Sequence, residues 1–145
     1  MSDYRELIAA AEADYGKGQF KEAHIGYGRA MAAGDECDFH CRRMRGICSR
    51  RVGEQRLEKA LEGPDDSVHY FNQAAKWLAK SEANLESALQ YAPDDHRGEI
   101  RLEQARTEET IARFIEISGG DPQRRLSLAR RYRDEALASA ASHSC

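Results

Sequence analysis

Apolar residues recur along this chain at steps of three and four, the spacing of one face of an α-helix. The clearest stripe follows two glycines and consists of Phe20, Ala23, Tyr27, Ala30 and Met31. The sequence contains no run in which β-branched and polar residues alternate, as they do on a half-buried strand. The pattern therefore predicts an all-α fold.

Prolines, glycines and aspartates divide the chain into helical blocks. The expected blocks are 2–15, 20–33, a third from about 35, then 68–92, 95–118 and 121–142. We expect Ser2 or Asp3, Asp35 and Asp121 to cap the first, third and last helices. The apolar stripe of the third block slips in phase near Gly53, so either a turn splits this block or one helix carries an irregularity. The 68–92 block keeps its phase, and one helix or two would fit.

One segment of the chain resembles a known helical repeat. The run Gly18-Gln19-Phe20-Lys21-Glu22-Ala23, with Tyr27 and Ala30 after it, resembles the second half of a tetratricopeptide repeat. Two degenerate echoes, Leu57-Ala60-Leu61 and Leu85-Ala88-Leu89, follow at spacings of 30 and 28 residues, against 34 in the family. The resemblance spans residues 3 to 93 and implies antiparallel helical hairpins stacked as a short solenoid.

The same resemblance implies one domain over 1–145 with two different parts. Repeat-like helix pairs, three in number, would occupy 1–93, and a long helix plus a capping helix would occupy 94–142, before a tail at 143–145. In the C-terminal half, closure into a bundle of long antiparallel helices is the alternative.

Tetratricopeptide proteins are mainly binding scaffolds, and the first helix of each pair lines their groove. Mapped onto this sequence, the resemblance places these partner-binding residues in that groove: Arg5, Glu12, Tyr15, Arg42, Arg45, Tyr70 and Gln73. Arg42 and Arg45 are able to receive a carboxylate or phosphate by bidentate hydrogen bonds. The alternative is that these residues form solvated, charged helix faces.

Cys37, His40 and Cys41 form the cluster with the best metal-ligand chemistry. Cys48 lies about 10 Å further along the same helix by helical rise, so it cannot join the same ion. Structural zinc sites usually bring paired C-x2-C hooks, which the sequence lacks. We therefore expect the cysteines to pack at a helix interface and expect no cofactor. A metal-binding or thiol redox sensor built on these three residues is the alternative.

Composition narrows the setting in which the protein works. With 41% apolar and 32% charged residues and no long apolar run, the chain is typical of a soluble globular protein without membrane spans. Acidic residues near the N-terminus and the sparse cysteines favour the cytoplasm. The excess of 17 arginines over 5 lysines fits a GC-rich bacterial genome. A net charge of −3 and the lack of a groove-reading motif disfavour nucleic-acid binding.

No arrangement typical of an active site is present in the sequence. Its histidines are scattered, H-E-x-x-H is absent, and no serine sits on a strand-turn-helix elbow. We therefore expect a non-enzymatic adaptor or scaffold that binds a protein or peptide. A helical bundle that forms homo-oligomers is a further alternative.

Overall fold

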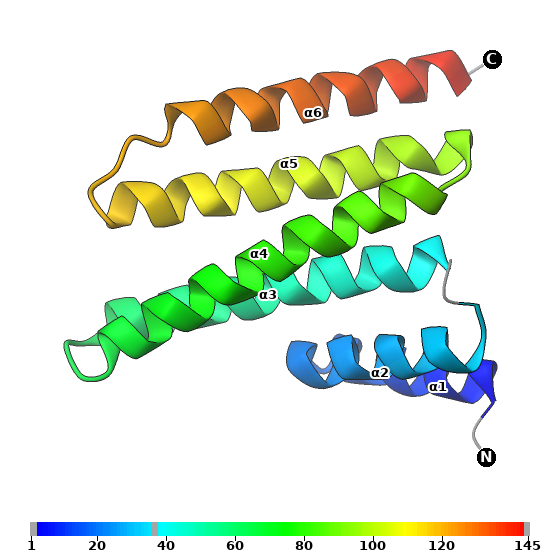
Figure 1. The fold of residues 1–145 in the computed structure, drawn as a ribbon, viewed down its shortest axis with the longest axis horizontal. Coiled ribbons are helices and arrows are strands. Elements are labelled where there is room, and N and C mark those ends of the chain that lie inside the picture. Colours follow the sequence, from blue (N-terminus) through cyan, green and yellow to red (C-terminus); the bar gives the residue numbers. More distant parts are fainter. Residues whose placement is uncertain (1–2, 36–37, 144–145) are drawn as a thin grey trace.

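Six α-helices make up the part of the chain that the computed structural model describes, residues 3–35 and 38–143. They are α1 (Tyr4–Gly16), α2 (Phe20–Ala33), α3 (Phe39–Glu62), α4 (Ser67–Tyr91), α5 (Asp94–Ile117) and α6 (Gln123–His143). No strand occurs within those ranges, so the predicted all-α fold is confirmed. The helices pack as three adjacent antiparallel pairs, α1 with α2, α3 with α4 and α5 with α6 (Figure 1).

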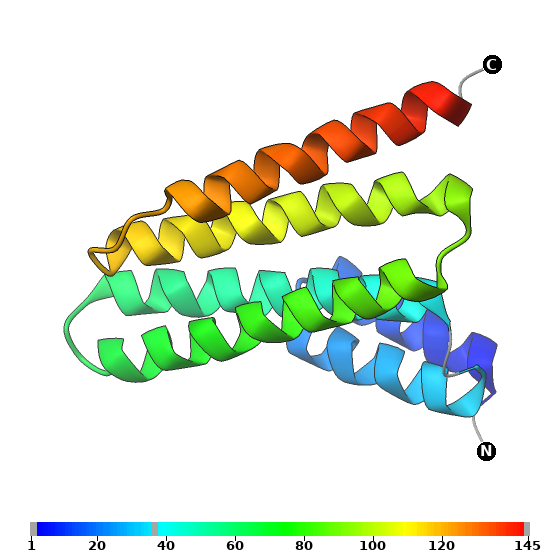
Figure 2. The same ribbon diagram turned by 45° about the horizontal axis from the view of Figure 1, so that its top comes forward.

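The pairs divide the chain differently from the predicted repeats. Helix α3 is continuous over 24 residues and α4 over 25, so residues 1–93 contain two hairpins and not three. The echoes of the repeat at Leu57 and Leu85 consequently lie in the second halves of long helices. The third pair comes from the last two helices, which stack at the side away from α1 and α2 (Figure 2).

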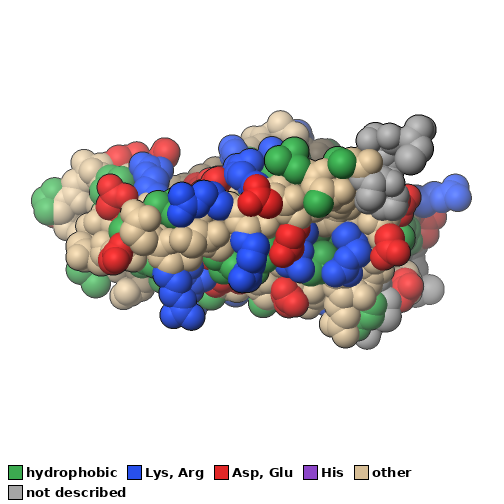
Figure 3. All heavy atoms as spheres, turned by 90° about the horizontal axis from the view of Figure 1, so that it is seen from above, with side chains coloured by type: hydrophobic (Ala, Val, Ile, Leu, Met, Phe, Trp, Pro, Cys, Tyr) green, Lys and Arg blue, Asp and Glu red, His purple; other side chains and the backbone are tan. Residues whose placement is uncertain are grey.

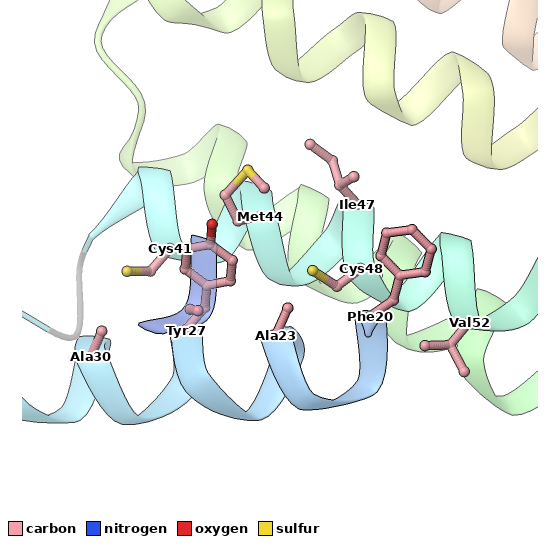
Figure 4. Close-up of a cluster of buried hydrophobic side chains, with 10 residues drawn as sticks. Phe20, Ala23, Tyr27, Ala30, Cys41, Met44, Ile47, Cys48 and Val52 are labelled. Carbon is pink, nitrogen blue, oxygen red and sulfur yellow. The ribbon is translucent and has the colours of Figure 1, made fainter. Parts of the chain in front are cut away.

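A hydrophobic core fills the space between the first three helices. Its buried members are Ala11, Phe20, Ala23, Tyr27, Ala30, Cys41, Met44, Ile47, Cys48 and Val52. Figure 4 shows Tyr27 and Phe20 of α2 directed toward the α3 side chains. Tyr27 is only 1% exposed, and burying an apolar group of this size contributes roughly 2 kcal/mol. The predicted stripe of α2 is therefore the face that holds the first two hairpins together.

The phase slip in α3 has a packing cause. Both Gly46 and Gly53 face α4. A Cβ at Gly46 would lie 2.6 Å from the Leu85 side chain, and a Cβ at Gly53 would lie 2.9 Å from the Leu78 side chain. The two glycines therefore let α4 approach closely, and Leu57 is fully buried further along the helix. Because α3 packs on α2 with one face and on α4 with another, its apolar positions change face without any break.

Aspartates cap the helices, in part where the sequence predicted. The side chain of Asp3 caps α1 by accepting a hydrogen bond from the backbone N–H of Glu6. Asp121 accepts a 3.0 Å hydrogen bond from the backbone N–H of Gln123, at the start of α6. The prediction of Asp35 as the cap of α3 is wrong, because Asp38 fills that position and accepts a 3.1 Å bond from the N–H of Cys41. Asp38 also accepts a hydrogen bond from the Tyr4 hydroxyl of α1.

The α5–α6 hairpin meets α3 and α4 largely through polar groups, which we call the polar seam. Its buried polar residues are Ser81 on α4 and Glu103, Gln104, Thr107, Glu108 and Thr110 on α5. The Ser81 hydroxyl donates to the Gly46 carbonyl at 2.8 Å and shares a 2.9 Å hydrogen bond with Thr107. These hydrogen bonds act beside a second apolar cluster, in which Leu85, Ala88 and Leu89 of α4 pack with Ile100 of α5, so both kinds of contact set how α5 sits on α4.

The sequence also predicts a chain without membrane-spanning helices. Within the described ranges, no helix combines the length and the apolar character needed to cross a bilayer.

Candidate partner-binding surface

One side of α4 carries a row of aromatic and polar side chains at steps of three and four. The row consists of Tyr70, Gln73, Trp77, Lys80, Asn84, Ser87 and Tyr91. This spacing places them on one face of the helix. Trp77 contacts His24 of α2, with 5.3 Å between ring centroids, and Tyr91 lies under the guanidinium of Arg42 of α3 at 5.1 Å. The row therefore borders α2 and α3, on the side where α2 and α4 lie nearer the viewer in Figure 1.

Positively charged side chains gather along this border. We call this group of residues the cationic strip. Its cations are Arg42, Arg45 and Arg56 of α3 and Lys80 of α4, and its rings are Trp77 and Tyr91 of α4 and His24 of α2. The ammonium of Lys80 lies 4.4 Å from the centroid of the Trp77 ring. Together with Arg42 on Tyr91, this makes two cation–π contacts in one strip, the kind of contact that holds a charge against a ring without neutralising it.

Arg45 occupies the centre of the cationic strip. Its guanidinium passes over the α2 backbone at Gly28, where a Cβ would lie 3.5 Å from Nε. The side chain is half-buried, and the same Nε has no hydrogen-bond partner. Burial and the neighbouring charge of Arg42 lower the pKa of Arg45. Within the described residues, no carboxylate forms an ion pair with Arg45, Arg56 or Lys80.

His24 is the most deeply buried polar residue of the strip. It is 6% exposed, and its Nε2 is buried without a hydrogen-bond partner. Burial, followed by the charges of Arg45 and Lys80, lowers the pKa of His24 to about 4. The imidazole is therefore neutral at pH 7. A buried polar nitrogen without a partner costs about 1–3 kcal/mol, so the strip carries unsatisfied hydrogen-bonding capacity as well as charge.

Six arginines outside the cationic strip form ion pairs with carboxylates in the described part of the chain. Arg133 holds Glu109 through two bonds of 2.8 Å and 2.7 Å, and Arg125 binds both Glu82 and Glu108 at 2.7 Å and 2.8 Å. Arg50, Arg51, Arg101 and Arg106 also have carboxylate partners. Blue and red side chains are interspersed on the face that α6 presents in Figure 3. Arg45 is thus unlike these six arginines, because it is half-buried and no carboxylate of the described residues pairs with it.

The structure separates the residues that were predicted to line one groove. Arg42 and Arg45 lie together on the cationic strip, but they turn toward α4 and α2, which are the second helices of their pairs. Tyr70 and Gln73 belong to the α4 row and so lie on a second helix, where the sequence analysis expected a first helix. The reason is that α3 continues past the predicted break, which moves every later helix by one place in the order.

The predicted residues of α1 lie apart from the strip. Arg5 and Glu12 are exposed, and the ring of Tyr15 packs edge-on against Phe20, with 5.3 Å between centroids. No hydrogen bond, ion pair or ring contact of the described residues connects Arg5 or Glu12 to Arg45. The sequence analysis also missed His24, Lys80 and Tyr91 as site residues. Their signal was present as a 3-4 spacing on α2 and α4, yet nothing local shows which face meets α3.

The cysteine cluster is built for packing in the described part of the chain. Cys37 lies outside the described residues. Cys41 and Cys48 are fully buried as free thiols, and burial raises the pKa of each to about 12. Both thiols are therefore protonated at neutral pH, whereas metal binding and redox exchange need the thiolate. Across residues 3–35 and 38–143, no three His, Cys, Asp or Glu side chains come together to hold a metal ion.

Two cavities lie on the C-terminal hairpin. One, of about 470 Å³, opens between α5 and α6 beside Leu102, Ala136 and Leu137. The other, of about 390 Å³, opens onto the polar seam beside Glu82 and Glu108. Burial and the adjacent Glu82 raise the pKa of Glu108 to about 7, against the opposing effect of Arg125. Because ion-pair networks also produce such shifts and Arg125 binds both carboxylates, this pair has a structural explanation.

No family model, curated protein or solved structure matches this chain. A function can therefore be proposed only from the chemistry of the chain's own surface.

Proposed function

We propose that the protein is a non-enzymatic adaptor or scaffold that binds a peptide or partner protein on the cationic strip. The observation that supports this most strongly is Arg45, a half-buried guanidinium at the centre of the strip without a carboxylate partner. Arginine and aromatic residues are enriched at the energetic centres of protein interfaces. Here they lie on three helices that are fixed by a common core, in the cytoplasmic and bacterial setting that composition favours.

Helical packing supports a binding role for this surface. Ala23 and Tyr27 hold α2 on α3, and Gly46 and Gly53 hold α4 close to α3, so the strip is rigid before any partner arrives. Binding to a preorganised surface loses less conformational entropy than binding to a mobile one. The geometry thus suits recognition rather than chemistry.

Self-association is a second candidate function, because some large apolar side chains are exposed. Val68 and Leu61 stand at the turn between α3 and α4, and Val68 is 72% exposed. A second copy of the chain covering this turn would bury them.

Native mass spectrometry of the protein purified gently from its host tests the two candidates. We expect a copurifying peptide or protein with the wild type, and its loss from the double variant Arg45→Glu, Lys80→Glu. Arg130→Glu is the matched control, since Arg130 is exposed on α6 and bonds only to Ser127. Retention of the same partner by the double variant, with helicity unchanged, would contradict the proposal. A bare species with an even number of subunits would favour self-association.

A further inference from the structure

Hydrogen-bond donors from three helices lie close together around His24, since the charges of both Arg45 and Lys80 act on its imidazole. The Lys80 ammonium lies 4.4 Å from the centroid of the Trp77 ring, and the centroid of the His24 ring lies 5.3 Å from it. Arg45 lies against Gly28, one helical turn after His24 on α2. His24 is more than nine-tenths buried, and its Nε2 has no partner. Neutral histidine, ammonium and guanidinium side chains can all donate to a single oxyanion.

We propose that a carboxylate side chain of an acidic peptide segment binds at this point, accepting hydrogen bonds from Arg45, Lys80 and Nε2 of His24. The inference rests on the proposed function and specifies the chemistry of its ligand. Lys80 is exposed on a flexible stem, so its ammonium can leave the Trp77 ring to meet the carboxylate.

The length of the strip favours a peptide over a single phosphate group. Arg42, Arg45 and Arg56 follow one another along α3, and the 14 residues from first to last span about 21 Å by helical rise. An extended peptide covers that distance with about six residues. Spaced carboxylates on an extended chain therefore match the spacing of these cations, whereas one phosphate would occupy the central position alone.

The charge of the whole molecule does not oppose this binding. The chain has a formal net charge of −3, which would repel an acidic segment at long range. At physiological ionic strength, however, the Debye length is about 8 Å, so charges outside the strip are largely screened. The local cations decide the contact, and the affinity is expected to fall as salt is added.

Trp77 provides a direct signal, because it is the one tryptophan in the chain. The experiment titrates its fluorescence with three probes: an end-blocked eight-residue peptide with glutamates at alternate positions, the same peptide with glutamines, and inorganic phosphate. The proteins are the wild type, Arg45→Gln, Lys80→Gln and Arg130→Gln. Lys80 and Arg130 are both exposed, so these two variants serve as a test and a control that leave the fold intact.

We expect the glutamate peptide to change the fluorescence and the glutamine peptide to leave it unchanged. Arg45→Gln and Lys80→Gln should each weaken binding at least fivefold, and Arg130→Gln should bind as the wild type does. Equal responses to the two peptides, or full affinity in both test variants, would overturn the inference. So would saturation by phosphate that leaves the glutamate peptide without effect, which would identify a phosphate site.

The two proposals can fail separately. If the copurified partner is lost from the Arg45→Glu, Lys80→Glu variant while the glutamate peptide gives no response, the binding surface stands and the carboxylate ligand is refuted. If the partner is retained by that variant, the proposed function itself fails.

Discussion

At Gly46 a single missing side chain sets the distance between two helices. A Cβ there would lie 2.6 Å from Cγ and Cδ2 of Leu85, which is 1% exposed and has no room to retreat. Overpacking of this kind costs about 1–3 kcal/mol, against a gain of about 1 kcal/mol in helix propensity when alanine replaces glycine. We therefore expect Gly46→Ala to lower the free energy of unfolding, by about 1 kcal/mol on balance, in urea denaturation followed by circular dichroism.

Gly28 supplies the control for that substitution, since it too lies in the middle of a helix. A Cβ there would meet only the Arg45 side chain, at an ordinary contact distance of 3.5 Å. Gly28→Ala should therefore be neutral or stabilising. An unfolding free energy that rises equally in both variants would show that the close approach of α3 and α4 does not depend on Gly46.

The glycines also show why the sequence could not decide whether α3 is broken or continuous. The sequence alone identified the phase change near Gly53, and either a break or a continuous helix would have explained it. The choice depends on Leu78, which lies 25 residues later and would be 2.9 Å from a Cβ at Gly53. A glycine that ends a helix and one that admits a neighbouring helix look the same in the sequence. The stripe of α2 was predictable because its buried residues keep one helical phase along the whole helix, although they pack against both α1 and α3.

Glu108 should give the protein a measurable dependence of stability on pH. The carboxyl is 4% exposed, faces Glu82 of α4 and Arg125 of α6, and has its pKa raised from 4.5 to about 7. Between these values the folded state binds more protons than the unfolded state, so stability falls as pH rises from about 5 to about 7. The shift corresponds to a loss on the order of 2 kcal/mol.

The variant Glu108→Gln isolates this contribution. The difference in unfolding free energy between wild type and Glu108→Gln should change by roughly that amount between pH 5 and pH 8. His24 acts in the opposite direction, since its pKa of about 4 makes stability rise between about pH 4 and 6.5. That effect is common to both proteins and cancels in the difference. A difference that stays constant with pH would mean that Glu108 is ionised normally in the folded protein.

At the scale of helices, the polar seam should make the α5–α6 hairpin the less stable part of the fold. The α3–α4 contact is apolar and close, with Leu78 and Leu85 almost fully buried. The α4–α5 contact combines a smaller apolar cluster, Leu85, Ala88, Leu89 and Ile100, with hydrogen bonds such as that of Ser81 with Thr107, which water can replace when the helices separate. Elements with fewer buried apolar contacts open locally before the whole protein unfolds.

Native-state hydrogen exchange tests this order. We expect amides in the middle of α5, around residues 103–111, to exchange roughly tenfold faster than those around residues 44–52 of α3. Amides in the middle of α6 should exchange at a rate close to that of α5, because the two would detach as one hairpin. Equal protection in α3 and α5 would instead indicate that all six helices unfold together.

The arrangement of helices limits how much of the binding surface the sequence could reveal. Arg42 and Arg45 were placed in a groove by the resemblance to the repeat family, and their binding of an anion stays a prediction. Their neighbours Trp77 and Lys80 come from a helix about 35 residues away, and His24 comes from the helix before. Which faces of α2 and α4 meet α3 depends on long-range packing. The sequence could therefore suggest what single side chains are able to bind, but it could not show that they are grouped in one strip.

For the whole molecule, the exposed surface predicts a monomer. The exposed large apolar residues Ile25, Ile117 and Leu137 stand on three different helices, and Leu61 and Val68 form only a small pair at the α3–α4 turn. Single apolar residues of this kind are normal on monomeric proteins, whereas stable self-association needs a contiguous patch. Charges of both signs cover the outer side of α6, which suits the end of a helical stack (Figure 3).

Sedimentation equilibrium at several concentrations measures this directly. We expect a mass of 16.3 kDa throughout for the wild type, and the same mass for Val68→Asp. The competing result is a larger mass for the wild type that returns to 16.3 kDa in Val68→Asp, because a charge at the α3–α4 turn would then be buried between two copies. Such a dimer would still leave the cationic strip on α2, α3 and α4 to be tested by its own variants. Monomeric behaviour combined with loss of a partner in the Arg45→Glu, Lys80→Glu variant is the outcome that an adaptor requires.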